Sequence, residues 1–188
     1  VINSHSHEDH MAGNGLFAEA RLHIHHDDLP GAESMDGLME VYGLTGSART
    51  EFERVILDEF HYTPRPDAQG FSDGHVFDLG GAVTVEAVHL PGHTRGHSGF
   101  RMDGVFFLSD IDLTGFGPYY GDVWSDLEDF ERSLDVVRGE ERSAVLQRMM
   151  DARDKLLTQL WAKRQSGLPF DTQAEAVTRR GEVRMEAD

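Results

Sequence analysis

The first ten residues hold the feature that most constrains this chain, a dense group of side chains that can bind metal ions. The segment reads His5-Ser6-His7-Glu8-Asp9-His10, with four histidine or aspartate side chains in six positions. Imidazole and carboxylate groups are ligands that suit zinc, iron and manganese. The competing interpretation is a histidine-rich surface loop.

The spacing within this segment predicts two pairs of ligands. Residues two apart on an extended chain point the same way, which pairs His5 with His7. Asp9 and His10 follow in a predicted turn, where they can reach a second point nearby. Two pairs of ligands at two nearby points are what a dinuclear metal site needs.

Further polar residues follow two apolar runs in the middle of the chain. The run 83–88 leads into His89-Leu90-Pro91-Gly92-His93-Thr94-Arg95-Gly96-His97, and the run 105–108 leads into Ser109 and Asp110. Both groups stand just past the end of a predicted buried strand. Because a sheet collects strand ends along one edge, we expect these side chains to meet those of the first segment.

Together these segments resemble the metallo-β-lactamase superfamily, most closely its glyoxalase II-like and lactonase-like hydrolases. H-x-H-x-D-H, then P-G-H-T-x-G-H, then a strand ending in Ser-Asp occur between residues 5 and 110 in the order and rough spacing of the family. The resemblance implies an α+β fold, an αββα sandwich with the metals at one edge of the sheets. We expect these 188 residues to lack the family's N-terminal strands and a strand-and-loop segment near residue 139.

The resemblance also implies roles for individual residues. Six residues would hold two metal ions: His5, His7 and His93 the first, Asp9 and His10 the second, and Asp110 both. Asp9 and Asp110 are the expected catalytic residues, with Asp9 also orienting the attacking hydroxide. His97 matches a position that supports the site from behind, and a purely structural histidine is equally open. Tyr119 or Tyr120, in the loop after Asp110, either donates a hydrogen bond to the substrate or packs.

The family normally has one more histidine downstream of the bridging aspartate, and this chain has none there. All 11 histidines lie between His5 and His97. Three explanations are open. The site is mononuclear or asymmetric; another residue, such as Asp112, Asp122 or an early histidine, takes the place; or the segment that carries the histidine is missing from the sequence. We favour the third.

From the resemblance we expect a metal-dependent hydrolase that attacks an ester-like carbonyl, in a thioester or a lactone, with a metal-bound hydroxide. The expected cofactor is zinc, with two ions per chain, and iron or manganese are the other options. Two alternatives belong to different classes. One is iron-dependent oxidation of a thiol or persulfide on the same fold, and the other is a degenerate, non-catalytic metal-binding domain.

Composition narrows the expected partners. The formal net charge is −17, and the only basic cluster lies near the C-terminal end, which disfavours a nucleic-acid surface. No apolar run approaches the roughly 20 residues that a membrane span needs. The chain has no cysteine, so it has no thiolate ligand. We expect a small-molecule substrate, no nucleic acid, no membrane and a cytoplasmic location, and we leave a homodimer open.

We expect one domain over residues 1–188. Within it, 30–72 is predicted to be a helical insertion over the site, whose methionine and aromatic residues line an apolar pocket or pack in a local core. Other predicted elements are helices at 11–20, 35–42, 49–60, 125–138 and 140–165 with a further short C-terminal helix, and hairpins at 76–88 and 100–108. Residues 21–25 alternate like a strand. We interpret His23, His25 and His26 as the end of that strand rather than a second metal site, although one of them could border the pocket.

Overall fold

The structure is a computed structural model that describes residues 1–111 and 121–139. The described elements lie in the unit Val1–Arg138, and the second unit, Gly139–Asp188, falls almost wholly outside them. The predictions for Tyr119, Tyr120 and the helices of 140–188 therefore lie outside the described residues, as does Asp112.

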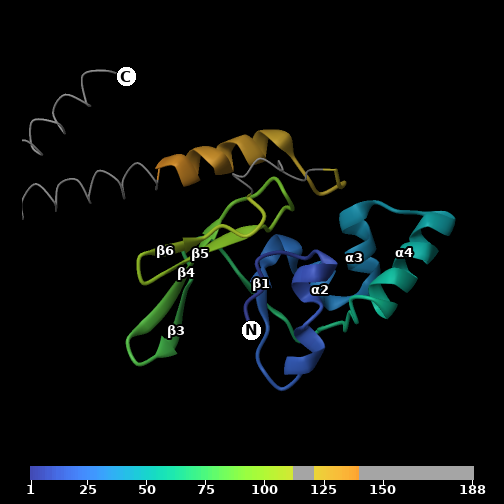
Figure 1. Ribbon diagram of the computed structural model, residues 1–188, viewed down its shortest axis with the longest axis horizontal. Coiled ribbons are helices and arrows are strands. Elements are labelled where there is room, and N and C mark those ends of the chain that lie inside the picture. The colour runs from blue at the N-terminus through green and yellow to red at the C-terminus, as the bar shows by residue number, and fades with distance from the viewer. Residues whose placement is uncertain (112–120, 140–188) are drawn as a thin grey trace, which may run out of the picture. The chain divides into compact units, whose positions relative to one another are not determined.

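Two sheets form the centre of the described unit (Figure 1). The larger is antiparallel, with the order β3-β4-β5-β6, and its strands are Val76–Gly80, Val83–His89, Ser98–Met102 and Val105–Phe107. The smaller pairs β1 (His23–His25) with β2 (Gln69–Phe71) in parallel. Ile2 adds a parallel bridge to His23, so the residues before the first motif pair as extended chain.

Both predicted hairpins are confirmed. β3 pairs with β4, and β5 pairs with β6, each in antiparallel register. The turn between β5 and β6 is made by Asp103 and Gly104, with φ angles of 50° and 77°. Positive φ at both central residues is what a tight two-residue hairpin turn requires, which explains the Asp-Gly pair.

In the described part of the chain, four α-helices and two 3₁₀ turns surround the smaller sheet. They are α1 (Glu8–Met11), η1 (Asn14–Phe17), η2 (His26–Asp28), α2 (Leu29–Glu33), α3 (Met35–Tyr42) and α4 (Gly46–Asp58). The hydroxyl of Ser34 caps α3 by accepting the Gly37 N–H at 3.1 Å, and Gly43 ends it at φ 67°. Residues 127–139 form a further helix.

Two boundaries differ from the prediction. Residues 11–20 hold only the last residue of α1 and one 3₁₀ turn, and Asp9 and His10 lie on α1 rather than in a turn. Residues 30–72 contain α3 and α4, yet this segment ends in β2, which pairs with β1. A three-residue strand is too short to show an alternating pattern, so β2 escaped the sequence analysis.

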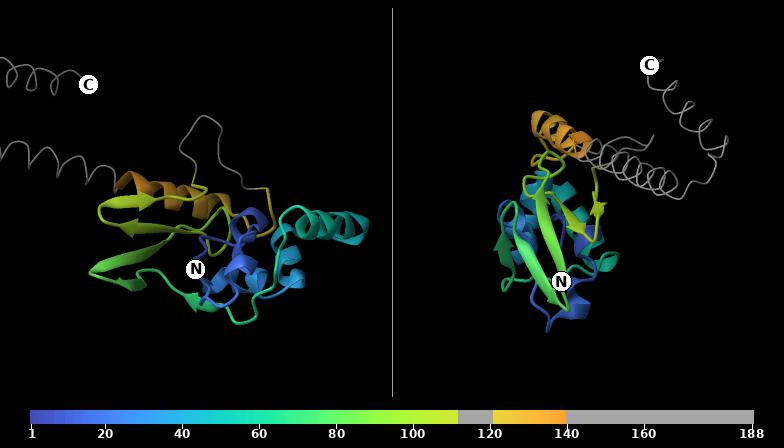
Figure 2. Two further views of the ribbon diagram at one scale, coloured as in Figure 1. Left: turned by 60° about the horizontal axis from the view of Figure 1, so that its bottom comes forward. Right: turned by 90° about the vertical axis from the view of Figure 1, so that its left-hand side faces the viewer.

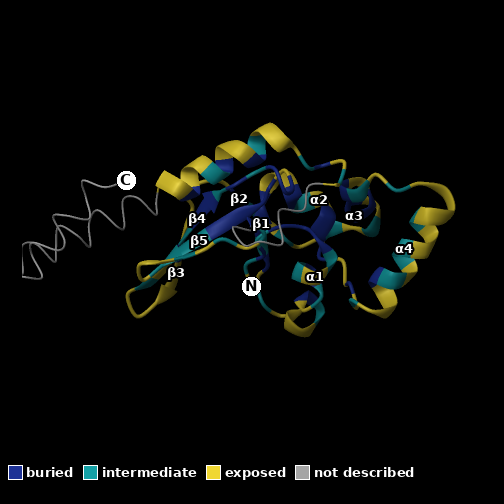
Figure 3. Ribbon diagram, turned by 45° about the horizontal axis from the view of Figure 1, so that its top comes forward, coloured by how far each residue is buried: buried dark blue, intermediate teal, exposed yellow. Residues whose placement is uncertain are grey.

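Three apolar clusters lie between these elements, which form layers. Figure 3 shows on the ribbon how far each residue is buried. Phe130 and Val137 of the helix 127–139 pack against Val88 and Leu90 on one face of the larger sheet. The other face meets the smaller sheet through a second cluster, Phe71, Phe77, Val85 and Ala87. The helices α2 to α4 cover the far side of β1 through a third, which includes Ile24, Leu38 and Ile56. The order helix, sheet, sheet, helix confirms the αββα sandwich, and the two views of Figure 2 show the same arrangement.

Strand alternation decides which side chains enter the space between the sheets. In β4, Val85 and Ala87 face the smaller sheet, whereas Val88 faces the helix 127–139. In β1, Ile24 packs among the α-helices, and the ring of His25 instead meets Phe71 of the neighbouring strand. Because successive side chains of a strand point to opposite faces, the last residues of β1 and β4, His25 and His89, both lie in the layer between the sheets.

Among the described residues, no helix combines the length and apolar character that crossing a bilayer requires.

Candidate metal centre

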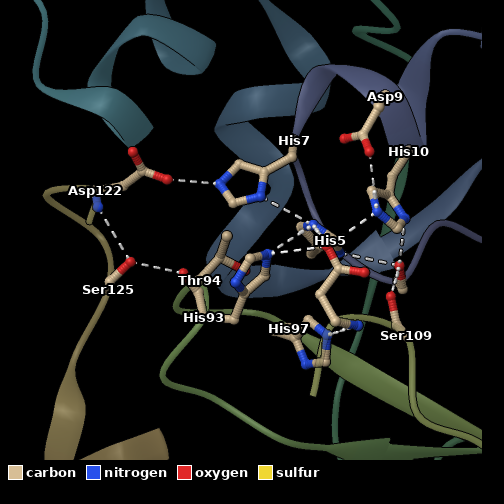
Figure 4. Close-up of polar contacts among 12 residues, drawn as sticks. His5, His7, Asp9, His10, His93, Thr94, His97, Ser109, Asp122 and Ser125 are labelled. Atoms are coloured by element: carbon tan, nitrogen blue, oxygen red, sulfur yellow. Dashed lines mark hydrogen bonds and ion pairs between the residues drawn. The ribbon is translucent and has the colours of Figure 1, made fainter. Parts of the chain in front are cut away.

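The predicted ligands meet beyond the ends of the strands, as Figure 4 shows. His5 and His7 follow the extended residues at the start of the chain, His93 lies in the loop between β4 and β5, and Asp110 follows β6. One ligand atom from each of these four residues lies within 4.8 Å of the other three. All three histidines are buried.

The distances within this group fit a single metal ion. Nε2 of His5 lies 3.0 Å from Nδ1 of His7 and 3.2 Å from Nε2 of His93. Oδ2 of Asp110 lies 3.2 Å from Nε2 of His93 and 3.6 Å from Nε2 of His5. Ligands at about 2.0–2.1 Å from a tetrahedral zinc ion stand about 3.3 Å from one another. The four atoms therefore have the spacing of one coordination sphere.

Neighbouring side chains hold two of these rings by their other nitrogen. Nε2 of His7 lies 2.9 Å from Oδ2 of Asp122, and Nδ1 of His5 lies 3.0 Å from Oγ of Ser4. A carboxylate or hydroxyl at the remote nitrogen fixes the tautomer and the orientation of a ligating imidazole. Asp122, which we considered as a substitute for the missing histidine, instead stands behind His7.

The expected ligands of a second ion also lie near Asp110. Nε2 of His10 lies 3.2 Å from Oδ2 of Asp110 and 3.6 Å from Oδ2 of Asp9. The same carboxylate oxygen thus lies within 3.6 Å of nitrogens of His10, His93 and His5, which come from both predicted ligand groups. Asp9 keeps 59% of its side chain exposed. In the described part of the chain, this second position has fewer protein ligands around it than the first.

The electrostatics of the cluster favour the metal-binding forms of His5 and Asp110, whereas His10 would have to give up a proton to bind a metal. Burial lowers the pKa of His5, and the neighbouring histidines lower it further. Hydrogen bonds from His10 and His93 hold the pKa of Asp110 well below its usual range. Burial acts to lower the pKa of His10, but the hydrogen bond and charge of Asp110 outweigh it and the pKa is raised. A neutral imidazole and an ionised carboxylate are the states that a cation requires.

His97 is hydrogen-bonded to the backbone through both of its ring nitrogens. Its Nδ1–H donates to the carbonyl of Leu90 at 2.9 Å, and its Nε2 accepts the backbone N–H of Asp110 at 3.1 Å. Both ring nitrogens are therefore in use, and the ring holds the backbone that carries Asp110. Burial, reinforced by His93, lowers the pKa of His97 to about 3, so the ring is neutral at neutral pH.

Asp28 is a site residue that the sequence analysis missed. Its buried carboxylate accepts the Ser6 N–H at 2.9 Å, the Thr94 hydroxyl at 2.6 Å and the Gly96 N–H at 2.6 Å. It therefore ties the loop of His5 and His7 to the loop of His93. Nothing in the sequence distinguishes Asp28 from its neighbour Asp27, because its three partners come from two distant segments.

The glycine of P-G-H-T is required by close packing. Gly92 has a φ of 120°, and a Cβ atom there would stand 2.2 Å from the backbone nitrogen of Phe130. Only glycine lets the loop lie directly on the helix 127–139. The adjacent Pro91 carbonyl accepts a hydrogen bond of 2.7 Å from the hydroxyl of Ser133, which fixes the same contact.

A cleft of about 700 Å³ opens over the cluster. Its lining combines the predicted ligands His7, Asp9, His93 and Asp110 with residues of α3, α4 and their flanking segments, which are Tyr42, Leu44, Phe52 and Phe60. The hydroxyl of Tyr42 donates a hydrogen bond to the carboxylate of Glu8, and its ring stacks on His7 with centroids 5.4 Å apart. The cleft thus joins a polar end to an apolar wall.

Comparison with known proteins identifies the class to which this fold and site belong. Residues 1–159 match the family model of the Metallo-beta-lactamase superfamily. The chain belongs to this superfamily, and its His/Asp cluster is one that could bind metal. No curated protein matches the chain.

Solved structures support the same fold. The metallo-beta-lactamase family protein TTHA1429 from Thermus thermophilus is 21% identical, with a TM-score of 0.56 over 85% of this chain and 63% of that one. The protein TTHA1623, solved in a di-iron-bound form, is 23% identical, with a TM-score of 0.51 over 72% and 61%. The FEZ-1 metallo-beta-lactamase from Legionella gormanii is 21% identical, with a TM-score of 0.50 over 72% and 52%. The chain thus spans 52–63% of the length of these proteins.

Proposed function

We propose that this chain is a metal-dependent hydrolase that cleaves a small-molecule ester-like bond, either a thioester or a lactone. The observation that carries the proposal is the convergence of three imidazole nitrogens and the Asp110 carboxylate, at distances of 3.0–3.6 Å, at the floor of a cleft. We propose zinc as the metal, with two ions per chain. TTHA1623 was solved with two iron ions, and imidazole with carboxylate suits iron as well, so the bound metal has to be measured directly.

The residues present fit such an ion. His5, His7, His93 and Asp110 would hold the first metal ion, and Asp9, His10 and Asp110 would hold the second. When bound, such an ion lowers the pKa of water toward neutrality and polarises a carbonyl oxygen.

The chain itself supplies the carboxylates that face the substrate. Asp110 remains ionised because His10 and His93 hold its pKa low. Asp9 lines the same cleft with most of its side chain exposed, so its oxygens can orient a water molecule and accept its proton. The hydroxyl of Tyr42 is already bonded to Glu8, which makes it a wall of the cleft rather than a free proton donor.

The apolar part of the cleft lining favours a substrate that carries an apolar group beside the bond to be hydrolysed. Leu44, Phe52 and Phe60 line the cleft together with the ligands. Each 100 Å² of apolar substrate surface buried there contributes about 2.5 kcal/mol to binding. An acyl chain lying against these side chains would place its carbonyl at the polar end.

The test combines metal analysis with hydrolysis of thioester and lactone series of increasing acyl length. Protein purified without chelators should contain zinc and hydrolyse at least one series. Asp110→Ala should lower the metal content and reduce turnover at least about 100-fold, because it removes the ligand shared by both positions. The matched control is Asp103→Asn, in the exposed turn between β5 and β6, where a positive φ suits asparagine.

Three outcomes would contradict the proposal. Metal-loaded protein that hydrolyses no thioester or lactone would favour the degenerate, non-catalytic domain. Iron in place of zinc, together with oxygen uptake on a thiol or persulfide, would favour the oxidative alternative. Unchanged turnover in Asp110→Ala would remove the bridging role of Asp110.

A further inference from the structure

We propose that Glu8 selects the substrate of the cleft by its charge, and that the preferred substrate carries a positively charged nitrogen beside its apolar group. The inference rests on the proposed function only in taking this cleft as the substrate site. Glu8 stands between the predicted ligands His7 and Asp9 in the sequence and lines the same cleft. Among the described residues, the other carboxylates of the lining, Asp9, Asp110 and Asp122, already have positions at the metal centre. Glu8 is therefore free to meet the substrate.

The carboxylate of Glu8 is held in place by Tyr42. The hydroxyl of Tyr42, the last residue of α3, donates a hydrogen bond to Oε2 of Glu8. The Tyr42 ring is itself fixed by two other rings, because it stacks on His7 with centroids 5.4 Å apart and meets the ring of Phe52 edge-on at 4.9 Å. One hydrogen bond uses one of about four lone-pair positions of a carboxylate. Glu8 is half-buried in the cleft lining, so its other positions are available to a bound molecule.

The charges around the cleft favour a cation over an anion. Among the described residues, the lining contains four carboxylates and neither a lysine nor an arginine, and residues 112–120 contain no lysine or arginine in their sequence. Arg95, two residues after His93, lies instead over the ring of Trp124, 4.7 Å from its centroid. The formal net charge of −17 also repels anions at long range. Metal ions would attract the carbonyl oxygen that reacts, so the selection by charge acts on another part of the substrate.

The order of groups in the cleft defines the shape of such a substrate. Glu8 adjoins the predicted ligands in the sequence, and Tyr42 contacts both Glu8 and Phe52 of the apolar part. The carboxylate therefore lies where the polar and the apolar parts of the lining meet. A fitting substrate has its carbonyl at the metal centre, a cationic nitrogen a few bonds away and an apolar chain along Phe52. An acyl thioester of an amino thiol, or a lactone that carries an amino group, has this order of groups.

The test measures how tightly zinc-loaded protein binds three hexyl compounds that differ in charge. Hexyltrimethylammonium is cationic, 1-hexanol is neutral and hexanesulfonate is anionic, and dissociation constants are obtained by NMR titration. Glu8→Gln removes the charge but keeps an oxygen that can accept the Tyr42 hydroxyl. The matched control is Glu40→Gln, which removes the same charge from an exposed position of α3. Elemental analysis establishes that all the proteins carry the same amount of zinc.

Wild type and Glu40→Gln should bind the ammonium compound most tightly and the sulfonate most weakly. In Glu8→Gln the dissociation constant of the ammonium compound should rise about tenfold, whereas that of hexanol should change by less than about twofold. Tyr42→Phe keeps the charge of Glu8 but removes its anchor, so its preference for the cation should lie between those of wild type and Glu8→Gln. In wild type, the methyl protons of the ammonium group should show nuclear Overhauser contacts with the Tyr42 ring.

Two results would overturn the role of Glu8. One is an equal loss of cation binding in Glu8→Gln and Glu40→Gln, which would assign the attraction to the general acidity of the chain. The other is a wild type that binds hexanol as tightly as the ammonium compound. Circular dichroism confirms that each variant is folded, and the wild-type ranking with Tyr42→Phe decides the question if Glu8→Gln does not fold. No step depends on turnover, so a chain that hydrolyses no ester would contradict the proposed function and leave this result unaffected.

Discussion

The carboxylate of Asp28 accepts a hydrogen bond of 2.6 Å from the hydroxyl of Thr94, 66 residues further along the chain. The same carboxylate accepts the backbone N–H of Ser6 and of Gly96. Ser6 lies between two of the predicted metal ligands, His5 and His7, and Thr94 follows a third, His93. One buried side chain therefore sets how the two ligand loops stand relative to each other.

Asp28→Asn should destabilise the metal-free protein by about 1–3 kcal/mol. An amide offers one acceptor oxygen where the carboxylate has two, and its NH₂ group meets N–H donors. Urea denaturation followed by circular dichroism measures the loss, and Asp58→Asn, at an exposed position of α4, is the control with no loss expected. Zinc affinity should fall with stability. Equal denaturation midpoints for Asp28→Asn and wild type would show that Asp28 does not stabilise the contact between the two loops.

Removing His93 should affect metal content more than removing His97. His93→Ala deletes a nitrogen that lies 3.2 Å from both Nε2 of His5 and Oδ2 of Asp110. His97→Ala removes the acceptor for the backbone N–H of Asp110 and the donor to the Leu90 carbonyl, but no predicted ligand, so it should lower stability while most of the metal remains. Metal per chain after dialysis decides the order. The reverse order would mean that the wrong histidine has been assigned as the ligand.

The metal-free protein should lose stability in acid through His97. Its folded pKa of about 3 lies below the ordinary value of 6.5, so the unfolded chain binds this proton more readily. The stability that the neutral ring contributes is fully present above pH 6.5 and is lost as the pH falls toward 3. One such group gives a slope of up to about 1.4 kcal/mol per pH unit.

Unfolding of metal-free wild type and His97→Gln, measured between pH 7 and pH 4, tests this expectation. Glutamine keeps a donor and an acceptor but does not take up a proton, so its stability should fall less steeply with acid. Parallel curves for the two proteins would show that His97 contributes nothing to the acid sensitivity.

The apolar wall of the cleft should set the preference for acyl length. Phe52 lines the cleft, whereas Leu57 lies on the same helix with 51% of its surface exposed. Phe52→Ala should lower kcat/KM for the longest hydrolysed acyl substrate about tenfold, because it removes roughly 1.5 kcal/mol of apolar contact. Leu57→Ala serves as the control.

The quantity to compare is the ratio of kcat/KM for long and short acyl groups, which does not depend on how much of the enzyme is folded. Phe52 also packs on the helical core, so its replacement can cost stability without changing this ratio. A ratio that stays constant in Phe52→Ala would place the acyl group elsewhere.

Local sequence patterns were sufficient to predict the elements whose ends are marked by capping or turn residues. The helix at α3, the hairpin turn at Asp103 and Gly104, and the strand leading to His89 all follow from residues that are neighbours in sequence. The convergence of His5, His7, His93 and Asp110 was predictable in part for a related reason, while their choice as ligands followed from the family resemblance. Residues that sit just past strand ends collect at one edge of a sandwich, whatever the details of its packing.

Sequence by itself thus determined that helices and hairpins mix in this fold and that groups able to bind metal follow its strands, because periodicity, turn residues and donor chemistry are readable along the chain. The resemblance to a known superfamily implied the αββα sandwich and the choice of predicted ligands. Tertiary structure alone decided that Asp28 joins two loops, that Asp122 stands behind His7, and that His25 stacks on His89. Each of these contacts links residues between 22 and 115 positions apart. The stability that each contact contributes depends on which partner the fold brings to it. We had interpreted His25 as a strand end, and that is where it lies; only the packing of the two sheets brings His89 against it.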